Sequence, residues 1–176
     1  IEKTAAMSWG FVPLTRYQGG GPEAVLEPLK EHLNDYHPLM IQYYGSGVQA
    51  CYRGPRLFDS EETRVMVKET LDWYKKYRDV LNADMIQLRR PDGRDWDGFI
   101  HVNPKGKHKG FVMLYNPTKE IMQRKITLPL YYTGISKMAQ ITSKEGKKKS
   151  ISLSPTKEIT LDFTIAPDSY TWFLIE

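Results

Sequence analysis

Two short segments in the first half of the chain carry side chains that could bind a polar, ring-shaped ligand. Arg16 and Tyr17 lie at the end of one apolar run, and Gln49, Tyr52 and Arg53 lie close together further along. Guanidinium and amide groups donate hydrogen bonds in planar geometry, and a tyrosine ring offers an aromatic face to C–H groups. These residue types therefore suit ligand recognition. The alternative is that they brace the loops in which they lie.

A second group of polar residues, Asp92-Gly93-Arg94-Asp95-Trp96-Asp97, places three carboxylates close together. Calcium binds clustered oxygen atoms, but the spacing matches no EF-hand loop and Arg94 lies among the acids. We therefore expect Arg89, Arg90 and Arg94 to pair with these carboxylates in a structural role. The alternative is that Trp96 stands exposed and stacks on a ligand.

The sequence contains no pattern that indicates a metal or a cofactor. The glycines at 19–21 are followed by Pro22 and Glu23, whereas a phosphate-binding loop would continue with Gly-Lys and a hydroxyl residue. Cys51 is the only cysteine, so an internal disulfide and a zinc cluster are both excluded. No metal-ligand spacing is found among the histidines, which are His32, His37, His101 and His108.

Charge gives no indication of a nucleic-acid partner. The chain has 25 basic and 21 acidic residues, and much of the excess lies at Lys144 and Lys147–Lys149, around Glu145-Gly146. Lysines that flank a glycine between two strand-like runs are typical of a solvated hairpin tip. No stretch has the length and hydropathy of a membrane span. Because the chain opens at Ile1 without an initiator methionine, we expect it to begin inside a longer polypeptide.

The first half of the chain alternates strand-like and helix-like segments. In order, we expect a strand at Trp9–Tyr17, a helix at 25–36 that Pro28 either kinks or restarts, a strand at Leu39–Tyr44, a loop at Gly45–Leu57 and a helix at about 60–81, capped by Asp59 with Glu62. This alternation predicts parallel strands joined by crossover helices. Two such units cannot bury both faces of a parallel sheet, so residues 1–82 are expected to need further units.

From residue 83 onward the pattern changes to short alternating runs separated by turns that contain glycine, proline or lysine. The expected strands are Met85–Arg90, Phe99–Val102, Gly110–Asn116, Met122–Leu130, Lys137–Thr142, Ser150–Leu153, Glu158–Thr164 and Tyr170–Ile175. Short strands at this spacing, without a helical period, predict an antiparallel β-sandwich over residues 83–176.

Several strings in the chain resemble the C-terminal part of α-galactosidase-like glycoside hydrolases. These strings are Trp73–Leu81, Arg89–Gly98, His101–Pro104, Tyr115-Asn116-Pro117 and the closing Tyr170–Glu176. The resemblance implies a mixed fold, in which the last two βα units of a (β/α)8 barrel lead into an antiparallel β-sandwich.

The resemblance also implies a function. Such enzymes use two carboxylates at the ends of earlier barrel strands, and nothing in residues 1–82 matches them. We therefore assign no catalytic residue and expect this chain alone to be inactive. Arg16 and Tyr17 at the carboxyl end of the first strand, together with Gln49, Tyr52 and Arg53 in the loop after the second strand, would contact a carbohydrate substrate. The expected partners are that substrate and the remainder of the polypeptide. The compartment stays open, with export to the periplasm or the extracellular space implied by the resemblance.

Two rival functions remain from the residues themselves. The sandwich could be a carbohydrate-binding module that holds a glycan on Trp96 or another exposed aromatic side chain, or a purely structural domain. A solvent-exposed aromatic surface on the sandwich would favour the module, whereas clustering of Arg16, Tyr17, Tyr52 and Arg53 would favour the enzyme.

Overall fold

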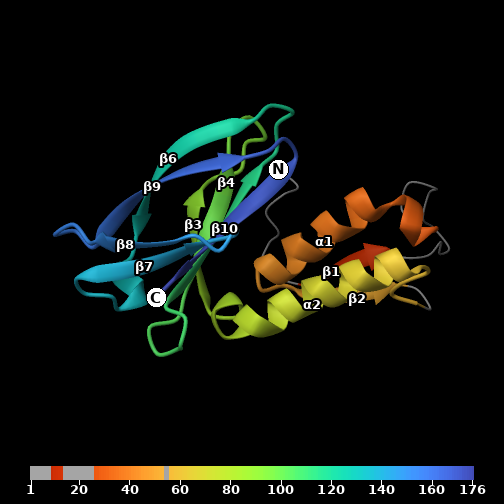
Figure 1. Cartoon of the computed structure of the whole chain (residues 1–176), viewed down its shortest axis with the longest axis horizontal. Coiled ribbons are helices and arrows are strands. Elements are labelled where there is room, and N and C mark those ends of the chain that lie inside the picture. Colours follow the sequence, from red (N-terminus) through yellow and green to blue (C-terminus); the bar gives the residue numbers. More distant parts are fainter. Residues whose placement is uncertain (1–8, 14–25, 54–55) are drawn as a thin grey trace. The chain divides into compact units, whose positions relative to one another are not determined.

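The computed structural model describes residues 9–13, 26–53 and 56–176, and it divides the chain into two compact units. One unit contains the described residues up to Arg78, and the other contains Asp79–Glu176 (Figure 1). The division falls within the last turns of the long helix α2 (Glu61–Leu81).

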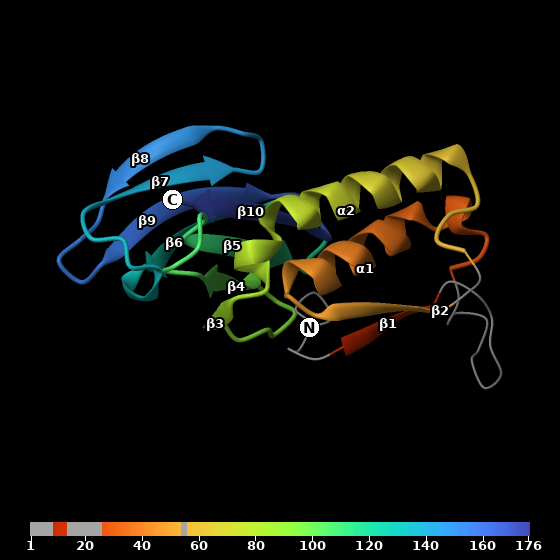
Figure 2. The same cartoon turned by 90° about the horizontal axis from the view of Figure 1, so that it is seen from below.

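The first unit has the order strand, helix, strand, helix. It comprises β1 (Trp9–Pro13), the short 3-10 helix η2 (Leu29–Glu31), α1 (Leu33–Gly45), β2 (Gln49–Arg53) and α2. β1 and β2 pair in parallel, from Trp9 opposite Gln49 to Pro13 opposite Arg53. Both helices lie on the same side of this two-stranded sheet (Figure 2). The parallel pairing predicted from the alternation of elements is therefore confirmed for these two strands.

The position of the second strand was predicted wrongly. Leu39–Tyr44 is the second half of α1, and β2 lies inside the segment Gly45–Leu57 that was expected to be a loop. A short apolar run does not by itself distinguish a strand from a buried helix. Here Met40 lies one helical turn beyond Tyr36, and both side chains are fully buried on one face of the helix.

The start of α2 also differs in detail from the expectation, although the helix itself is confirmed. The Oγ atom of Ser60 accepts a hydrogen bond from the backbone N–H of Thr63 at 3.2 Å, so Ser60 caps the helix. Asp59 instead accepts hydrogen bonds from the backbone N–H of Lys30 and the hydroxyl of Thr63. The aspartate therefore connects the helix start to η2 rather than forming the expected capping box with Glu62.

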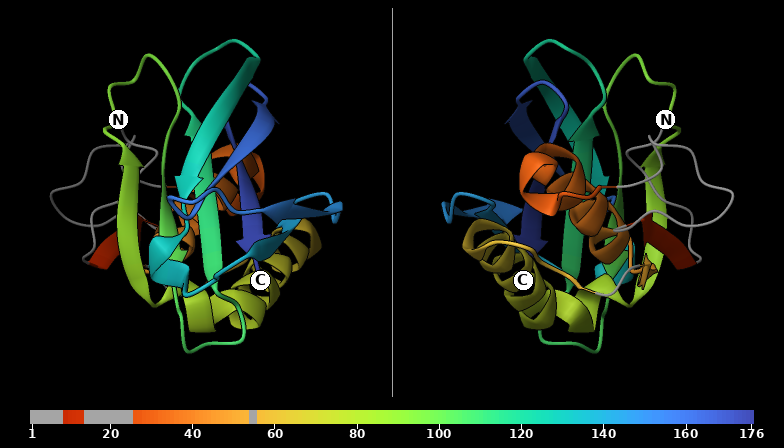
Figure 3. Two further views of the ribbon diagram at one scale, coloured as in Figure 1. Left: turned by 90° about the vertical axis from the view of Figure 1, so that its left-hand side faces the viewer. Right: turned by 90° about the vertical axis from the view of Figure 1, so that its right-hand side faces the viewer.

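All eight strands expected in the second half are present. They are β3 (Asp84–Arg89), β4 (Asp97–Val102), β5 (Gly110–Asn116), β6 (Met122–Pro129), β7 (Met138–Ser143), β8 (Lys148–Ser152), β9 (Glu158–Ile165) and β10 (Ser169–Ile175). Six of them form one antiparallel sheet in the order β3-β4-β5-β10-β7-β8, and β6 pairs with β9 in a second sheet. β3 and the β7–β8 hairpin stand at opposite edges of the larger sheet (Figure 3).

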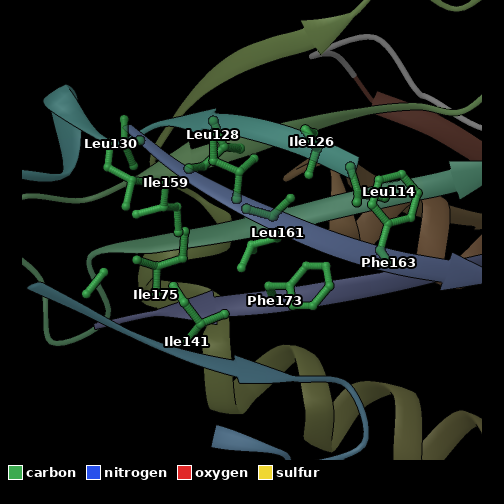
Figure 4. Close-up of a cluster of buried hydrophobic side chains, with 14 of the residues drawn as sticks. Leu114, Ile126, Leu128, Leu130, Ile141, Ile159, Leu161, Phe163, Phe173 and Ile175 are labelled. Atoms are coloured by element: carbon green, nitrogen blue, oxygen red, sulfur yellow. The ribbon is translucent and has the colours of Figure 1, made fainter. Parts of the chain in front are cut away.

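The core of the second unit lies between its two sheets. Leu128 and Phe163 from the smaller sheet meet Leu114 and Ile175 from the larger one, and all four are buried (Figure 4). β9 shows the alternation expected of a strand with one wet face, because every second residue is buried. β4 and β5 are buried at every position.

Gly98 is required by the close approach of β4 to β5. A Cβ atom at this position would lie 2.1 Å from the backbone oxygen of Met113 and 2.9 Å from the Leu114 side chain. The first clash is with backbone in the middle of a sheet, so it cannot be relieved by a side-chain rotation. The glycine that closes the Arg89–Gly98 string therefore has a packing role.

Candidate functional site

The first unit contains a group of tyrosines between its helices and β2. The hydroxyls of Tyr44 and Tyr52 lie 2.7 Å apart and share a hydrogen bond, and the Tyr36 hydroxyl donates to the Leu57 carbonyl at 2.9 Å. The rings of Tyr44 and Tyr74 pack with their centroids 4.6 Å apart. We call Tyr36, Tyr44, Tyr52 and Tyr74 the tyrosine cluster. Buried hydroxyls are thus satisfied within the unit.

Burial controls the ionisation of Tyr36, Tyr44 and Tyr52. Desolvation raises the pKa of Tyr36 and of Tyr52, and the neighbouring Tyr44 adds to the rise in both. The pKa of Tyr44 is also raised by burial, although its hydrogen bond with Tyr52 acts in the opposite direction. These phenols therefore stay protonated at ordinary pH. They can donate or accept hydrogen bonds, but they do not supply a phenolate base.

The predicted ligand-binding residues are only partly placed. Arg16 and Tyr17 lie outside the described residues. Gln49 and Arg53 are the first and last residues of β2, and the backbone of Arg53 is paired with that of Pro13 at the carboxyl ends of both strands. Tyr52 is half-buried, and it packs on the core formed by α1 and α2. Substrate contact by these five residues stays a prediction.

The acidic string after β3 forms a compact loop held by Arg89. The guanidinium donates to both carboxylate oxygens of Asp92, at 3.3 and 2.6 Å, and also to the Trp96 carbonyl at 2.6 Å. Asp92 accepts two further hydrogen bonds, from the backbone N–H groups of Arg94 and Asp95. These donors hold the pKa of Asp92 well below its usual range, with Arg89 as the largest cause. The expected structural pairing is confirmed for Arg89.

Trp96 belongs to the core of the second unit rather than to its exposed surface. It is half-buried, and its ring meets the Phe163 ring edge-on with centroids 5.8 Å apart. On the same loop, Asp95 accepts a hydrogen bond from the Arg124 guanidinium of β6 at 3.2 Å. The loop therefore joins the two sheets, and this geometry does not favour Trp96 as a platform for a ligand ring.

Two other features of the second unit carry polar groups. His108 pairs with the Asp79 carboxylate at 2.9 Å and lies 4.0 Å from that of Glu176. A groove of about 390 Å³ opens between β9 and the β7–β8 hairpin, with Leu161 and Phe173 in its floor and Lys147 and Lys149 at its rim. Lysines beside an unpaired strand edge are a common protection against edge-to-edge association.

In the described part of the chain, no three His, Cys, Asp or Glu side chains are arranged to hold a metal.

One surface feature was missed by the sequence reasoning. Tyr131 and Tyr132, on the 3-10 helix η3 (Tyr131–Thr133), are 69% and 62% exposed. Two adjacent tyrosines directly after an alternating strand and just before Gly134 were the available signal, because both cannot point into one core from a turn. We call them the exposed tyrosine pair.

No described helix has the length and hydropathy that crossing a bilayer requires. No protein-family model matches the chain, and a search of curated proteins found no match either.

Solved structures with a similar fold are glycoside hydrolases. α-Galactosidase I from Mortierella vinacea matches 85% of this chain with 12% identity and a TM-score of 0.56. A GH27 β-L-arabinopyranosidase from Geobacillus stearothermophilus matches 80% with 12% identity and a TM-score of 0.53. An α-amylase from Geobacillus thermoleovorans matches 80% with 10% identity and a TM-score of 0.51.

The matched part of the chain must include residues of the first unit, because the second unit, Asp79–Glu176, is little more than half of the chain. The chain spans only 38%, 30% and 32% of the three proteins. At this level of identity the likeness concerns the fold. The chain is therefore similar in fold to about one third of each of these three proteins.

Proposed function

We propose that this chain is part of a glycoside hydrolase, in which it supplies the last two βα units of a (β/α)8 barrel and a structural C-terminal β-sandwich. The observation that carries the proposal is the parallel pair β1–β2, joined through α1 and followed by α2, which leads directly into an antiparallel unit. A two-stranded parallel sheet with helices on one side needs further strands to be buried. The chain corresponds to only 38% and 30% of the length of two similar glycoside hydrolases, which leaves room for such strands in a longer polypeptide.

In this proposal the two catalytic carboxylates lie upstream of the chain. One acts as a nucleophile and the other as a general acid and base, as in retaining glycosidases. The contribution of this chain is recognition at the barrel rim. Parallel strands place substrate-binding groups at their carboxyl ends, where Arg53 ends β2. Tyr52, Arg16 and Tyr17 are the other proposed contacts at this end, whereas Gln49 begins β2 and therefore lies at the opposite end of the strand.

The test is turnover of chromogenic α- and β-glycosides by the polypeptide that carries this chain together with its upstream part. We expect hydrolysis of at least one glycoside by the larger polypeptide and none by residues 1–176 alone. A folded larger polypeptide that hydrolyses none of them would contradict the proposal.

A pair of arginine variants tests the proposed substrate contact. Loss of a charged donor to a sugar hydroxyl should raise KM about tenfold or more in Arg53→Ala, without a change in the unfolding midpoint. Arg56→Ala is the matched control, because Arg56 lies close in sequence but is paired with Glu27. Equal KM values for the two variants would remove Arg53 from the binding site.

The second candidate function, a carbohydrate-binding module, is favoured by one observation, the exposed tyrosine pair. It does not compete with the hydrolase proposal, because a sandwich can bind a glycan while a barrel cleaves one.

A further inference from the structure

The exposed tyrosine pair differs from the other aromatic residues of the second unit. Trp96, Phe111, Tyr115 and Phe163 are buried or half-buried in packed layers, whereas Tyr131 and Tyr132 are mostly in water. Their rings contact each other edge-on, at 89° and with centroids 5.2 Å apart. This contact leaves most of the aromatic surface of both rings free to meet a ligand.

The turn that presents the pair is fixed on both sides by buried residues. Leu130 is fully buried, and its N–H donates to the Lys157 carbonyl at 2.8 Å. Thr133 is also fully buried, and its hydroxyl donates to the Leu130 carbonyl at 2.6 Å. Gly134 then leaves the turn with φ of 76°, a left-handed conformation that glycine adopts at little cost. A fixed turn loses little conformational entropy when a ligand binds to it.

The chemistry of the turn favours a neutral ligand. The segment from Leu130 to Ile135 contains no charged residue, although 26% of the chain is charged, so nothing in it selects an anionic partner. Two side chains also cover far less area than the roughly 800 Å² per partner of a stable protein interface. A pyranose ring has an apolar C–H face that stacks on an aromatic ring and hydroxyls that bond to phenols.

We infer that the exposed tyrosine pair is a carbohydrate-binding site on the sandwich, separate from the proposed catalytic barrel, and that it holds the neutral sugar rings of a polysaccharide. The choice of carbohydrate rests on the proposed function. The site would retain a long substrate through contacts that take no part in hydrolysis.

The test measures retardation of the larger polypeptide in native gels that contain soluble starch or galactomannan. We expect at least one polysaccharide to retard the wild type, and Tyr131→Ala/Tyr132→Ala to bind about tenfold more weakly, as expected for the loss of two stacking contacts. Tyr131→Phe/Tyr132→Phe should retain most of the affinity, because the rings remain. Ile121→Ala is the matched control, since Ile121 is an equally exposed (68%) apolar side chain of the same unit.

The outcomes separate this inference from the hydrolase proposal. Hydrolysis of a small chromogenic glycoside, measured on the same proteins, should not change in the double alanine variant. Retardation without any hydrolysis would refute the proposed function and leave the binding site standing. Wild-type protein that neither polysaccharide retards, or alanine and Ile121→Ala variants that bind alike, would overturn the inference. A change of elution volume in the alanine variant, with unchanged retardation, would instead identify a protein contact and also overturn it.

Discussion

The two units of this protein bury their strands in different ways. In the second unit, the six-stranded sheet and the β6–β9 pair enclose a core built entirely from that unit's own residues, including Leu128, Phe163 and Phe173. Among the described residues of the first unit, β2 has one neighbouring strand, and the apolar cluster comes mainly from α1, α2 and the segments next to them. An antiparallel sandwich can be complete by itself, whereas parallel strands need cover on both faces.

The two units therefore differ in how far their strands are covered by residues of the same unit. The second unit encloses its core with its own two sheets, and its surface is free to have a separate binding role. In the proposed enzyme the first unit is part of a larger barrel, and its polar residues would act beside strands from the remainder of the polypeptide.

The largest effect is expected from Gly98→Ala in the second unit. The added Cβ would meet the Met113 carbonyl oxygen at 2.1 Å, so β4 and β5 must separate. We expect the free energy of unfolding to fall by more than about 4 kcal/mol, measured by chemical denaturation. Gly146→Ala is the control: nothing lies within 4 Å of its Cβ position, and only its φ of 81° opposes the change. A loss of about 1–2 kcal/mol is expected there, and similar losses for both would show that the sheet can yield.

Hydrogen exchange compares the two units directly. In residues 1–176 alone, amides of β2 should exchange about 100-fold faster than those of β5, because β5 lies between two strands and β2 pairs with one. In the larger polypeptide the difference should narrow, since the proposed barrel would cover β2. Equal protection in the short chain would mean that the first unit is complete by itself, which would remove the main support for the barrel.

Alkaline pH should lower the unfolding free energy of the second unit through the ionisation of buried Tyr115 and half-buried Tyr170. Burial raises the pKa of Tyr170 from 10.0 to about 12 and also raises that of Tyr115. A raised pKa in the folded state stabilises the protein fully below pH 10.0, and this stabilisation is lost as the pH rises toward about 12.

Comparison with Tyr170→Phe isolates the contribution of one residue, about 1–2 kcal/mol after allowance for partial exposure. The comparison is needed because Lys144, which lies over the Tyr170 ring and has a pKa lowered by burial, acts in the opposite direction. Denaturation of both proteins at pH values on either side of this range provides the measurement. A wild type whose stability falls no more steeply than that of the variant would contradict the assignment.

The smallest effect concerns Tyr52 in the first unit. Tyr52→Phe leaves the Tyr44 hydroxyl without its partner, so we expect a loss of about 1 kcal/mol in unfolding free energy. Tyr132→Phe, with an exposed hydroxyl, should change stability by less than about 0.5 kcal/mol. A raised KM in Tyr52→Phe, with unchanged stability, would indicate that Tyr52 serves the substrate rather than the tyrosine cluster.

Much of the fold follows from local sequence. The helix at 61–81 and all eight antiparallel strands were predicted from the spacing of their apolar residues. Side chains that face one core recur about every 3.6 residues in a helix and every two residues in a strand, so the sequence itself shows the type of element. The prediction for Leu39–Tyr44 was wrong because a run of six residues in which only Gln42 is polar satisfies either period. The segment is helical in the structure, where Met40 is buried on the same face as Tyr36.

The candidate sites depended on contacts between residues far apart in sequence. The pairing of Arg89 with Asp92 could be predicted because the two residues are only three positions apart in the chain. The packing of Trp96 on Phe163, the hydrogen bond between Tyr52 and Tyr44, and the exposure of Tyr131 and Tyr132 could be learned only from the folded chain. Local sequence patterns specify which helices and strands form. The exposure of a side chain and its hydrogen-bond or packing partners depend on which distant segments the folded chain places against it.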